Sequence, residues 1–281
     1  KTDGLITVAT EQSLIGLSRS EKRKLGEKYG HLCLDEAHEL PAECYSELAQ
    51  YFKSFRINGL SATPFREDKL DPVIKLYIGP IVGIDDLGDF TTQVHIHRTK
   101  FEYQFERKKD QYYKLIEALI YNEERNRLII QDIMTHAEQG RVIVCYSNRI
   151  KHMELLEDTL NKEAPHIKTN ILASARRGYT LRADDQEAAK QELAEGKIQV
   201  LFGGKIVEQE FDCPPLSVAI LATPTKSRRL VEQVMGRCQR EFPGKKKAIL
   251  VDYFDENCKV LKFQFFSKNR RFYKNYHKEW F

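Results

Sequence analysis

Short apolar runs alternate along the chain with longer charged segments in which apolar residues recur at helical spacing. The apolar runs predict buried strands, and the charged segments between them predict helices that cover a parallel sheet. In the first third of the chain, strands are predicted at residues 4–9, 31–34 and 56–60, and helices at 20–29 and 41–52. This repeated strand–helix unit predicts the α/β fold class.

A second cycle of the same kind begins near residue 93. Its predicted strands are residues 93–101, 141–146, 167–172, 198–202, 217–222 and 247–252. Its predicted helices are residues 110–139 with a break near Asn122, 148–161, 184–195, 227–237, and 257 to the C-terminus. Segment 79–89 is rich in Gly and contains Pro80, so we expect a hinge there between two domains, residues 1–88 and 89–281.

Composition narrows the class of protein without naming a function. The 281 residues, 41% of them hydrophobic, suffice for two domain cores, and the formal net charge of +4 is too small to indicate a nucleic-acid partner by itself. Six scattered cysteines without a CxxC pair suggest a reducing compartment, cytoplasmic or nuclear. No apolar run is long enough for a membrane helix. Because the chain opens on Lys1 directly before an apolar run, we expect a fragment or a processed product.

Two adjacent acids, Asp35 and Glu36, follow the predicted strand 31–34 and begin the tetrapeptide Asp-Glu-Ala-His. Carboxylates at the tip of a buried strand are costly unless they are used. Phosphoryl transfer needs one carboxylate to hold Mg²⁺, usually through water, and a neighbouring base to orient or deprotonate the attacking water. The alternative is an acidic N-cap for the following helix, because Asp and Glu are favoured at helix starts.

The predicted strand 56–60 runs out into Ser61-Ala62-Thr63-Pro64. The hydroxyls of Ser61 and Thr63 can hydrogen-bond the carboxylates of the first motif, or they can cap the next helix. Capping would be the simpler interpretation of an isolated Ser-Ala-Thr. The triplet follows Asp-Glu-Ala-His at a distance of about 25 residues, and the carboxyl ends of parallel strands lie at one edge of a sheet, so we favour a joint site.

Residues 227–240 read SRRLVEQVMGRCQR and predict a basic helix. With 3.6 residues per turn, Gln233, Arg237 and Arg240 lie close together on one face or at its end. The guanidinium groups of Arg237 and Arg240 can stabilise charge on a transferred phosphoryl group. A solvated basic helix is the alternative, but it does not account for Gly236 in mid-helix, where Gly costs about 1 kcal/mol relative to Ala.

In this combination and order, the motifs resemble those of helicase superfamily 2 over nearly the whole chain. Asp35 to His38 resembles motif II, Ser61 to Thr63 resembles motif III, and Gln233-x-x-Gly236-Arg237-x-x-Arg240 matches the QxxGRxxR of motif VI. Residues 6–14 resemble motif Ib, 141–148 motif IV, and 198–214 motif V. The resemblance implies two tandem RecA-like parallel-sheet lobes, the first incomplete at its N-terminus, with motifs Ib to III in residues 1–88 and motifs IV to VI in 89–281.

The resemblance also implies roles and partners. Asp35 would bind Mg²⁺ through water, Glu36 would activate the attacking water, and Arg237 and Arg240 would reach the phosphates of ATP. His38 and Gln233 would couple the lobes at the nucleotide, and Asp212 would belong to the nucleotide site. Nucleic-acid contacts are implied for Thr10, Gln12, Ser61 and Thr63. The run Ser61 to Arg66 with Asp68 is similar to the (S/T)ATPxRxD form of the DNA-directed branch, which contains excision-repair-type helicases, phage recombination helicases and type I and III restriction motor subunits.

Two features depart from the family pattern. No GxxxxGK[ST] occurs in the sequence, so the Walker A cradle for the β- and γ-phosphates is missing, and we expect it before Lys1. The chain as given is therefore expected to hydrolyse ATP poorly. In motif V the family favours Thr near 204 and Gly near 210, where this chain has Gly204 and Glu210, and a carboxylate facing a phosphate would be repulsive.

Residues 259–281 hold seven Lys or Arg against one Glu, interleaved with eight aromatics. Basic groups neutralise phosphates and aromatic faces stack on bases, a combination suited to single strands. The same pattern is typical of a C-terminal helix whose aromatics pack on the sheet and whose charges face water, and we favour this interpretation.

Three functions follow from the sequence in order of preference. The first is the C-terminal part of an ATP-dependent motor that moves on or unwinds DNA. The second is a nucleic-acid-binding module that has lost Walker A and works without ATP. The third is an RNA helicase.

Overall fold

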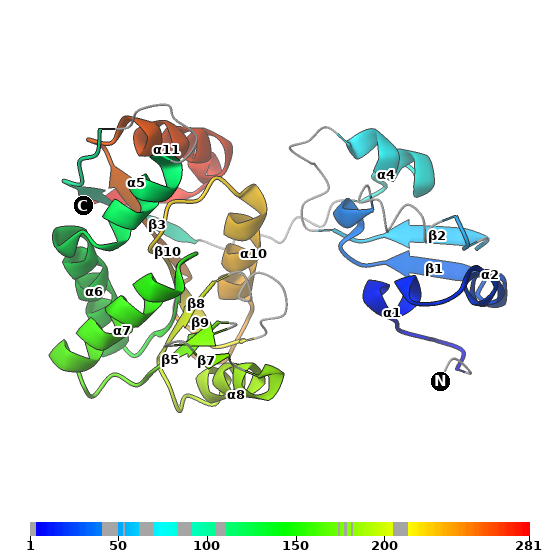
Figure 1. Cartoon of the computed structure of the whole chain (residues 1–281), viewed down its shortest axis with the longest axis horizontal. Coiled ribbons are helices and arrows are strands. Elements are labelled where there is room, and N and C mark those ends of the chain that lie inside the picture. Colours follow the sequence, from blue (N-terminus) through cyan, green and yellow to red (C-terminus); the bar gives the residue numbers. More distant parts are fainter. Residues whose placement is uncertain are drawn as a thin grey trace. The chain divides into compact units, whose positions relative to one another are not determined.

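The computed structural model of the chain describes residues 4–40, 50–52, 54–61, 70–83, 92–104, 111–173, 175–176, 179–180, 182–204 and 213–281. The chain divides into two compact units, Lys1–Asp86 and Leu87–Phe281, and each is described by itself (Figure 1). Within the described ranges, no helix combines the length and apolarity needed to cross a membrane.

Unit 1 is built around two parallel strands, β1 (His31–Leu34) and β2 (Arg56–Gly59), which pair from His31 with Arg56 to Leu34 with Gly59. Its described helices are α1 (Glu11–Ile15), α2 (Arg19–Lys28), the 3-10 turn η1 (Ala37–Glu39) and α4 (Asp71–Tyr77). Helix α2 begins at a capping box: Ser18 Oγ accepts from the Glu21 N–H at 3.3 Å, and the Glu21 carboxylate accepts from the Ser18 N–H at 2.9 Å.

The secondary structure predicted for unit 1 is partly correct. The strands at 31–34 and 56–60 and the helix at 20–29 are confirmed, whereas most of the helix predicted at 41–52 lies outside the described residues. The strand predicted at 4–9 is wrong: residues 4–6 form bends, residues 7–9 have no regular secondary structure, and Leu5, Ile6 and Val8 are almost fully exposed. An apolar run becomes a strand only where a neighbour accepts and donates its backbone hydrogen bonds, and the described residues of unit 1 supply none beside this run.

Unit 2 contains a seven-stranded sheet with the order β11-β3-β10-β9-β4-β8-β5, in which every neighbouring pair is parallel. Its strands are β3 (Gln93–Thr99), β4 (Val142–Tyr146), β5 (Thr169–Leu172), β8 (Val200–Gly203), β9 (Leu216–Leu221), β10 (Ile249–Asp255) and β11 (His277–Trp280). A separate antiparallel pair joins β6 (Ala175–Arg176) to β7 (Tyr179–Thr180). The described helices are α5 (Gln111–Ile120), α6 (Glu123–Glu138), α7 (Ile150–Glu163), α8 (Ala183–Ala194), α10 (Arg228–Gln239), α11 (Lys259–Arg271) and the 3-10 turn η2 (Tyr273–Asn275).

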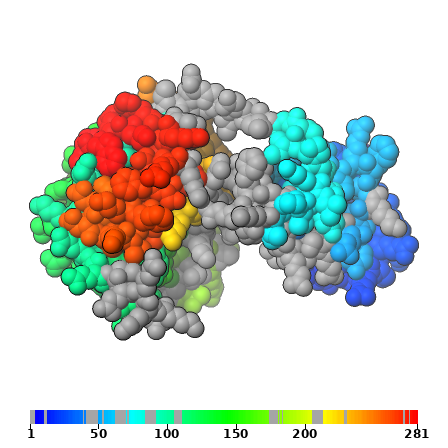
Figure 2. Space-filling view, turned by 90° about the horizontal axis from the view of Figure 1, so that it is seen from above, coloured from blue at the N-terminus to red at the C-terminus, as the bar shows by residue number. Residues whose placement is uncertain are grey.

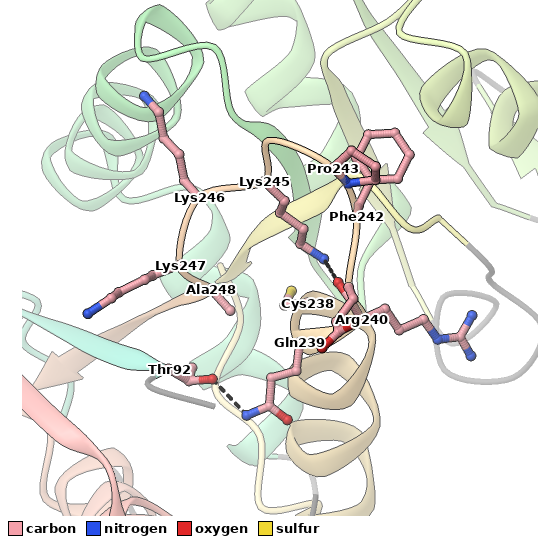
Figure 3. Close-up of a pocket in the computed structure, with 11 residues that line it drawn as sticks. Thr92, Cys238, Gln239, Arg240, Phe242, Pro243, Lys245, Lys246, Lys247 and Ala248 are labelled. Carbon is pink, nitrogen blue, oxygen red and sulfur yellow. Dashed lines mark hydrogen bonds between the residues drawn. The ribbon is translucent and has the colours of Figure 1, made fainter. Parts of the chain in front are cut away.

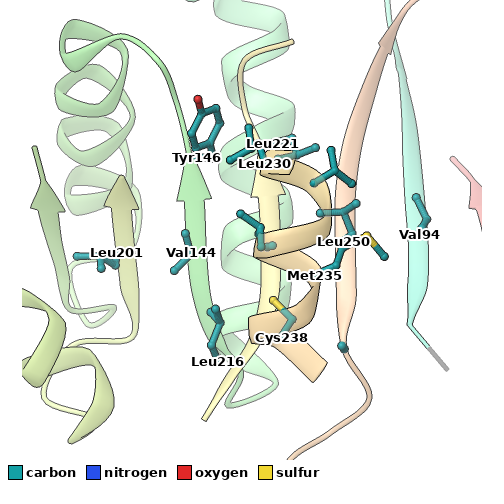
Figure 4. Close-up of a cluster of buried hydrophobic side chains, with 14 of the residues drawn as sticks. Val94, Val144, Tyr146, Leu201, Leu216, Leu221, Leu230, Met235, Cys238 and Leu250 are labelled. Atoms are coloured by element: carbon teal, nitrogen blue, oxygen red, sulfur yellow. The ribbon is translucent and has the colours of Figure 1, made fainter. Parts of the chain in front are cut away.

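Helices cover both faces of this sheet, as expected for parallel strands that are buried on both sides. On one face α10 packs over β4, β9 and β10 through a cluster that includes Leu230, Met235 and Leu250 (Figure 4). On the other face α6 and α7 pack through a second cluster that includes Ile129, Leu156 and Ile220. The α/β fold with a parallel sheet is therefore confirmed, and the break predicted near Asn122 separates α5 from α6.

The C-terminal segment differs from the prediction. We predicted one helix from residue 257 to the end, but α11 ends at Arg271 and the last residues form β11, which pairs with β3 from His277 with Gln93 to Trp280 with Ile96. Beyond Arg271 the chain passes through the 3-10 turn η2, with Phe272 and Tyr273 buried, before it becomes extended. The backbone can then donate to the edge of β3: the Phe281 N–H bonds the Ile96 carbonyl at 2.9 Å.

A buried ion pair connects α6 to the C-terminal ends of three strands. The Arg125 Nε donates to Asp255 Oδ1 at 2.9 Å and its Nη1 donates to the Ala222 carbonyl at 2.6 Å. Thr99 donates its hydroxyl to the same Asp255 oxygen at 2.6 Å. Arg125 and Asp255 are only 2% and 1% exposed, so each charge depends on the other for compensation of its lost hydration.

We expect Arg125→Leu to lower the free energy of unfolding of unit 2 by about 3–5 kcal/mol, because it leaves the Asp255 carboxylate buried without its cation. Urea denaturation followed by the emission of Trp280, the single tryptophan, measures this change in unit 2. The control is Lys197→Gln, which breaks a surface pair with Glu195 and should leave the midpoint unchanged. Equal midpoints for the two variants would contradict the assigned role of the pair.

A buried histidine lies near this ion pair, where it contacts Asn126 of α6. His152 Nε2 lies 2.9 Å from Asn126 Oδ1 and His152 Nδ1 lies 3.1 Å from Ser147 Oγ. Burial, with a smaller contribution from the nearby Arg125 charge, lowers the pKa of His152 from 6.5 to about 3. The ring is thus neutral in the folded protein at pH values where it would be protonated in the unfolded chain.

Because the folded pKa is below the unfolded one, the contribution of His152 to stability is complete above pH 6.5 and is lost as the pH falls toward 3. We expect His152→Gln to be less stable than the wild type near neutral pH but to lose about 1–2 kcal/mol less on going from about pH 7 to about pH 5. Urea midpoints at the two pH values test this. His97 and His136 also have lowered pKa values and Asp132 a raised one, so only the difference between variant and wild type is diagnostic. Parallel pH profiles would exclude titration of His152.

Candidate functional site

The two acids of unit 1 lie in a tight turn at the end of β1. Asp35 Oδ1 accepts a hydrogen bond from the Glu36 N–H at 2.9 Å. Glu36 has φ 49° and ψ 44°, and within the described residues it is the one non-glycine residue with positive φ. A left-handed conformation costs a residue with a side chain roughly 1–2 kcal/mol. Such strain persists at functional sites when the surrounding structure enforces it.

His38 connects this turn to the end of β2. Its side chain is buried, and its Nδ1 lies 2.9 Å from Ser61 Oγ and 3.1 Å from Glu36 Oε2. A backbone hydrogen bond joins the same two segments: the Ala37 N–H donates to the Leu60 carbonyl at 2.8 Å. The hydroxyl of Ser61 is therefore linked to the acidic pair through the imidazole. The site predicted jointly from the two motifs is brought together in unit 1, while Thr63 lies outside the described residues.

Gly59 makes this close approach possible. A Cβ at this position would lie 2.7 Å from the Cβ of Ala37 and 2.7 Å from Cδ1 of Ile78. Glycine inside a strand often marks such an approach of neighbouring chain, which is a signal that the sequence contains and that our sequence analysis did not use.

The remaining predicted residues of unit 1 are less informative. Thr10 is the N-cap of the short helix α1, and its hydroxyl accepts from the Ser13 N–H at 3.3 Å. This contact explains the local structure of Thr10 without a nucleic acid, so the contact implied by resemblance stays a prediction. The side chain of Gln12 and the whole of Asp212 and Glu210 lie outside the described part of the chain.

In unit 2, α10 carries Gln233 and Arg237, both partly buried, and ends at the exposed C-cap residue Arg240. The Ser227 hydroxyl caps the start of the helix by accepting from the Leu230 N–H at 3.1 Å. A Cβ added to Gly236 would meet no atom within 4 Å in the structure, so packing within unit 2 does not require glycine there. Gln233 and Arg237 thus lie one turn apart on α10, and Arg240 follows the end of the helix. That the three motif VI side chains lie close together stays a prediction.

A pocket of about 570 Å³ lies at the C-terminal end of α10 and is lined by residues that include Thr92, Gln239, Lys245 and Lys247 (Figure 3). Lys245 donates to the carbonyls of Pro214 and Arg240 at 2.8 and 2.7 Å, and burial lowers its pKa. Gln239 donates to the hydroxyl of Thr92 at 2.7 Å, which ties α10 to the first described residue of the β3 segment. Figure 3 shows the Arg240 guanidinium pointing away from Thr92 and Lys247. The hydrogen bonds from Lys245 to Pro214 and from Gln239 to Thr92 were not predicted, because they join residues distant in the sequence.

Comparison with known proteins agrees with this architecture. Residues 1–66 match the family described as type III restriction enzyme, res subunit, and residues 124–241 match the helicase conserved C-terminal domain. The order of these two matches is that of the motifs in the sequence. The chain belongs to helicase superfamily 2.

Relatives of this superfamily 2 chain include L396 of Acanthamoeba polyphaga mimivirus, named as an ATP-dependent RNA helicase, with 26% identity over 95% of this chain and 51% of that protein. The DNA 3'-5' translocase XPB2 of Sulfurisphaera tokodaii is 25% identical over 88% of this chain and 62% of its own length. The superfamily 2 chain thus spans between half and two thirds of these relatives.

Solved structures share the fold. A fragment of an HsdR subunit of a type I restriction enzyme from Vibrio vulnificus superposes with a TM-score of 0.68 at 18% identity, covering 96% of this chain and 50% of that one. S. cerevisiae Dbp5 bound to RNA and ADP BeF3 gives 0.62 at 15% identity, covering 98% of this chain and 64% of that one. At these identities the superpositions establish two tandem RecA-like lobes and leave the substrate of the superfamily 2 chain open.

We expect Gly59→Ala to destabilise the β1–β2 pair by about 1–3 kcal/mol, because the added methyl group overlaps Ala37 and Ile78. Hydrogen exchange of peptides covering β1 and β2 reports on this pair independently of unit 2. The matched control is Gly30→Ala at the start of β1, where an added Cβ meets no atom within 4 Å. Equal protection of β1 and β2 in the two variants would show that the close approach at Gly59 is not needed.

Proposed function

We propose that the chain is the C-terminal part of an ATP-dependent helicase or translocase that acts on DNA. The observation that carries the proposal is the strained Glu36 beside Asp35, tied through His38 to Ser61. A structural N-cap does not need a left-handed glutamate or a buried imidazole joining two strand ends. A site that must present a base at a fixed position does.

The carboxylate pair fits a magnesium ion that arrives with a nucleotide. Among the described residues, no group of three or more His, Cys, Asp or Glu side chains could hold a metal by itself. Mg²⁺ bound with a nucleotide needs no such cage, because waters and phosphate oxygens fill most of its coordination sphere and one or two carboxylates suffice. Asp35 would hold the hydrated ion. When bound, Mg²⁺–ATP supplies the transferable phosphoryl group.

The side chains then divide the chemistry. Glu36 orients the attacking water and accepts its proton, and the guanidiniums of Arg237 and Arg240 stabilise the negative charge that develops on the phosphoryl oxygens. His38 and Gln233 would transmit the state of the nucleotide, and Asp212 would complete the nucleotide site. The open space beside Gly236 supports a role for α10 beyond packing within unit 2, because glycine there weakens the helix without a packing gain.

Nucleic-acid contact is proposed for Thr10, Gln12, Ser61 and Thr63. DNA is favoured over RNA because Ser61 to Arg66 with Asp68 has the form of the DNA-directed branch, and XPB2 is named as a DNA translocase. The name of L396 favours RNA, so an RNA helicase is the second candidate. ATPase stimulation by duplex DNA, single-stranded DNA and RNA separates the two.

The phosphate cradle completes the proposal. The sequence contains no GxxxxGK[ST], and we propose that this loop comes from residues outside the sequence, so that the chain alone hydrolyses ATP poorly. An ATP-independent binding module would instead lack the loop in the parent protein as well. The described cysteines are free thiols, in keeping with the proposed cytoplasmic or nuclear location.

In the parent protein with its Walker A loop, we expect Glu36→Gln to lower the DNA-stimulated ATPase rate by about 10²–10⁴-fold, because an amide cannot accept the proton of the attacking water. ATP affinity should change little, and nucleotide binding measured by fluorescence provides that control. Substitution of the exposed Glu27, in the last turn of α2, is the matched carboxylate control. Full turnover by Glu36→Gln would remove Glu36 from the mechanism.

A further inference from the structure

One face of α11 is both basic and aromatic. Residues Lys259, Lys262, Phe263, Phe266 and Arg270 recur at helical spacing and are all exposed, and this set is called the α11 face. Figure 2 shows α11, in orange, adjoining the chain's last residues, in red, on one side of unit 2. The face lies outside every segment that the superfamily motifs occupy.

The aromatic rings of the segment fall into two groups. Phe265, Phe272 and Tyr273 are buried, as the packing interpretation predicts, but Phe263 and Phe266 are 77% and 38% exposed. Composition alone could not separate the groups, because exposed Phe263 and Phe266 flank buried Gln264 and Phe265 in one run of four residues. Packing of α11 on the sheet therefore explains only part of its aromatic content.

The exposed ring of Phe266, together with that of Trp280, is held in place by buried rings. Phe266 lies edge-on to Phe254 with 5.4 Å between ring centroids, and Trp280 lies edge-on to the same ring at 5.7 Å. Both also contact Phe265, at 6.2 and 5.8 Å. Rings fixed by such contacts lose little conformational entropy when a flat ligand stacks on them.

The charges of the face point to an anionic partner. Every charged residue of α11 is basic, and Lys268 is neutralised by buried Asp252 at 2.5 Å. Within the described residues, no acidic side chain lies within 4.0 Å of the charged groups of Lys259, Lys262 or Arg270. The three cations span about 16 Å of helix, at 1.5 Å per residue. Arg98, which pairs with Glu256, lies over the Trp280 ring at 5.3 Å.

We propose that the α11 face binds an unpaired stretch of nucleic acid, with Lys259, Lys262 and Arg270 at the phosphates and Phe263 and Phe266 stacked on bases. Cations flanking flat apolar rings complement a strand of alternating phosphates and exposed bases, whereas the bases of a duplex are already stacked on each other. The proposal takes from the proposed function only the class of partner. Because it needs no ATP, it gives the protein a second, nucleotide-independent contact with its strand.

The test uses the full 281-residue chain and a fluorescein-labelled oligothymidylate of about 20 nucleotides. Anisotropy gives the affinity, and quenching of Trp280 by the unlabelled oligonucleotide reports directly on this region, because Trp280 is the single tryptophan. We expect the double variant Phe263→Ala, Phe266→Ala to bind at least about fivefold more weakly. Lys259→Gln with Lys262→Gln should weaken binding and also reduce the slope of log affinity against log salt by about 1.

The matched control combines Tyr121→Ala, an exposed aromatic in the turn between α5 and α6, with Lys151→Gln, an exposed cation on α7, and should bind as the wild type does. Thermal unfolding confirms that each variant is folded. A duplex of the same length should bind more weakly than the single strand.

Wild-type affinity in both double variants, or oligonucleotide binding without a change in Trp280 emission, would overturn the proposal. If Thr10→Ala lost oligonucleotide binding while both α11 double variants kept it, the result would also overturn the proposal, although it would support the proposed function. A change in sedimentation of the aromatic variant with unchanged oligonucleotide affinity would reassign the face to a protein partner. Because no assay contains ATP, an active Glu36→Gln enzyme would reject the proposed function and leave this test standing.

Discussion

The buried ion pair of Arg125 and Asp255 is the contact on which the order of unit 2 depends most. Two charges withdrawn from water are tolerated only at bonding distance, with the Ala222 carbonyl and the Thr99 hydroxyl taking up the remaining hydrogen-bonding capacity. A small shift of α6 along the sheet would leave both charges uncompensated. Apolar packing on either face is less discriminating, because aliphatic side chains accept several registers at similar cost. The hydrogen bonds of this ion pair therefore fix α6 relative to the C-terminal ends of β3, β9 and β10.

Much of the fold could be predicted because its signals are local. The strand at 31–34, the helix at 20–29 and the break near Asn122 follow from periodicity and from residues that favour turns or caps. Two predictions failed where the outcome depends on a distant partner. Residues 4–9 have the composition of a strand but lack a neighbour among the described residues, and residues 277–280 form one because the edge of β3 is available. Neither condition can be read from the segment itself.

The candidate site shows the same division between composition and geometry. Spacing suggested the acids, the hydroxyls and the arginines as candidates, since each motif follows a strand or lies on a helix or at its end. The left-handed conformation of Glu36 and the hydrogen bond between His38 and Ser61 could not be foreseen, because they depend on how closely β1 and β2 approach. Gly59 permits this approach because it has no side chain, and a glycine in the sequence does not by itself show which neighbour will occupy the space. The exposure of two of the three phenylalanines in α11 could not be foreseen for a related reason, because their sequence pattern suits both a core and a surface.

The position of β3 in the sheet bears on the order in which unit 2 is made. The first strand of the unit pairs with its last two, β10 and β11, and Gln93 contacts Glu279 across 186 residues of sequence. Contacts of such long sequence separation form late, since the intervening chain must first be brought together. During synthesis β3 therefore emerges with both of its partners still untranslated. Its apolar residues must remain soluble, or be shielded by other factors, until the ribosome has released nearly the whole of unit 2.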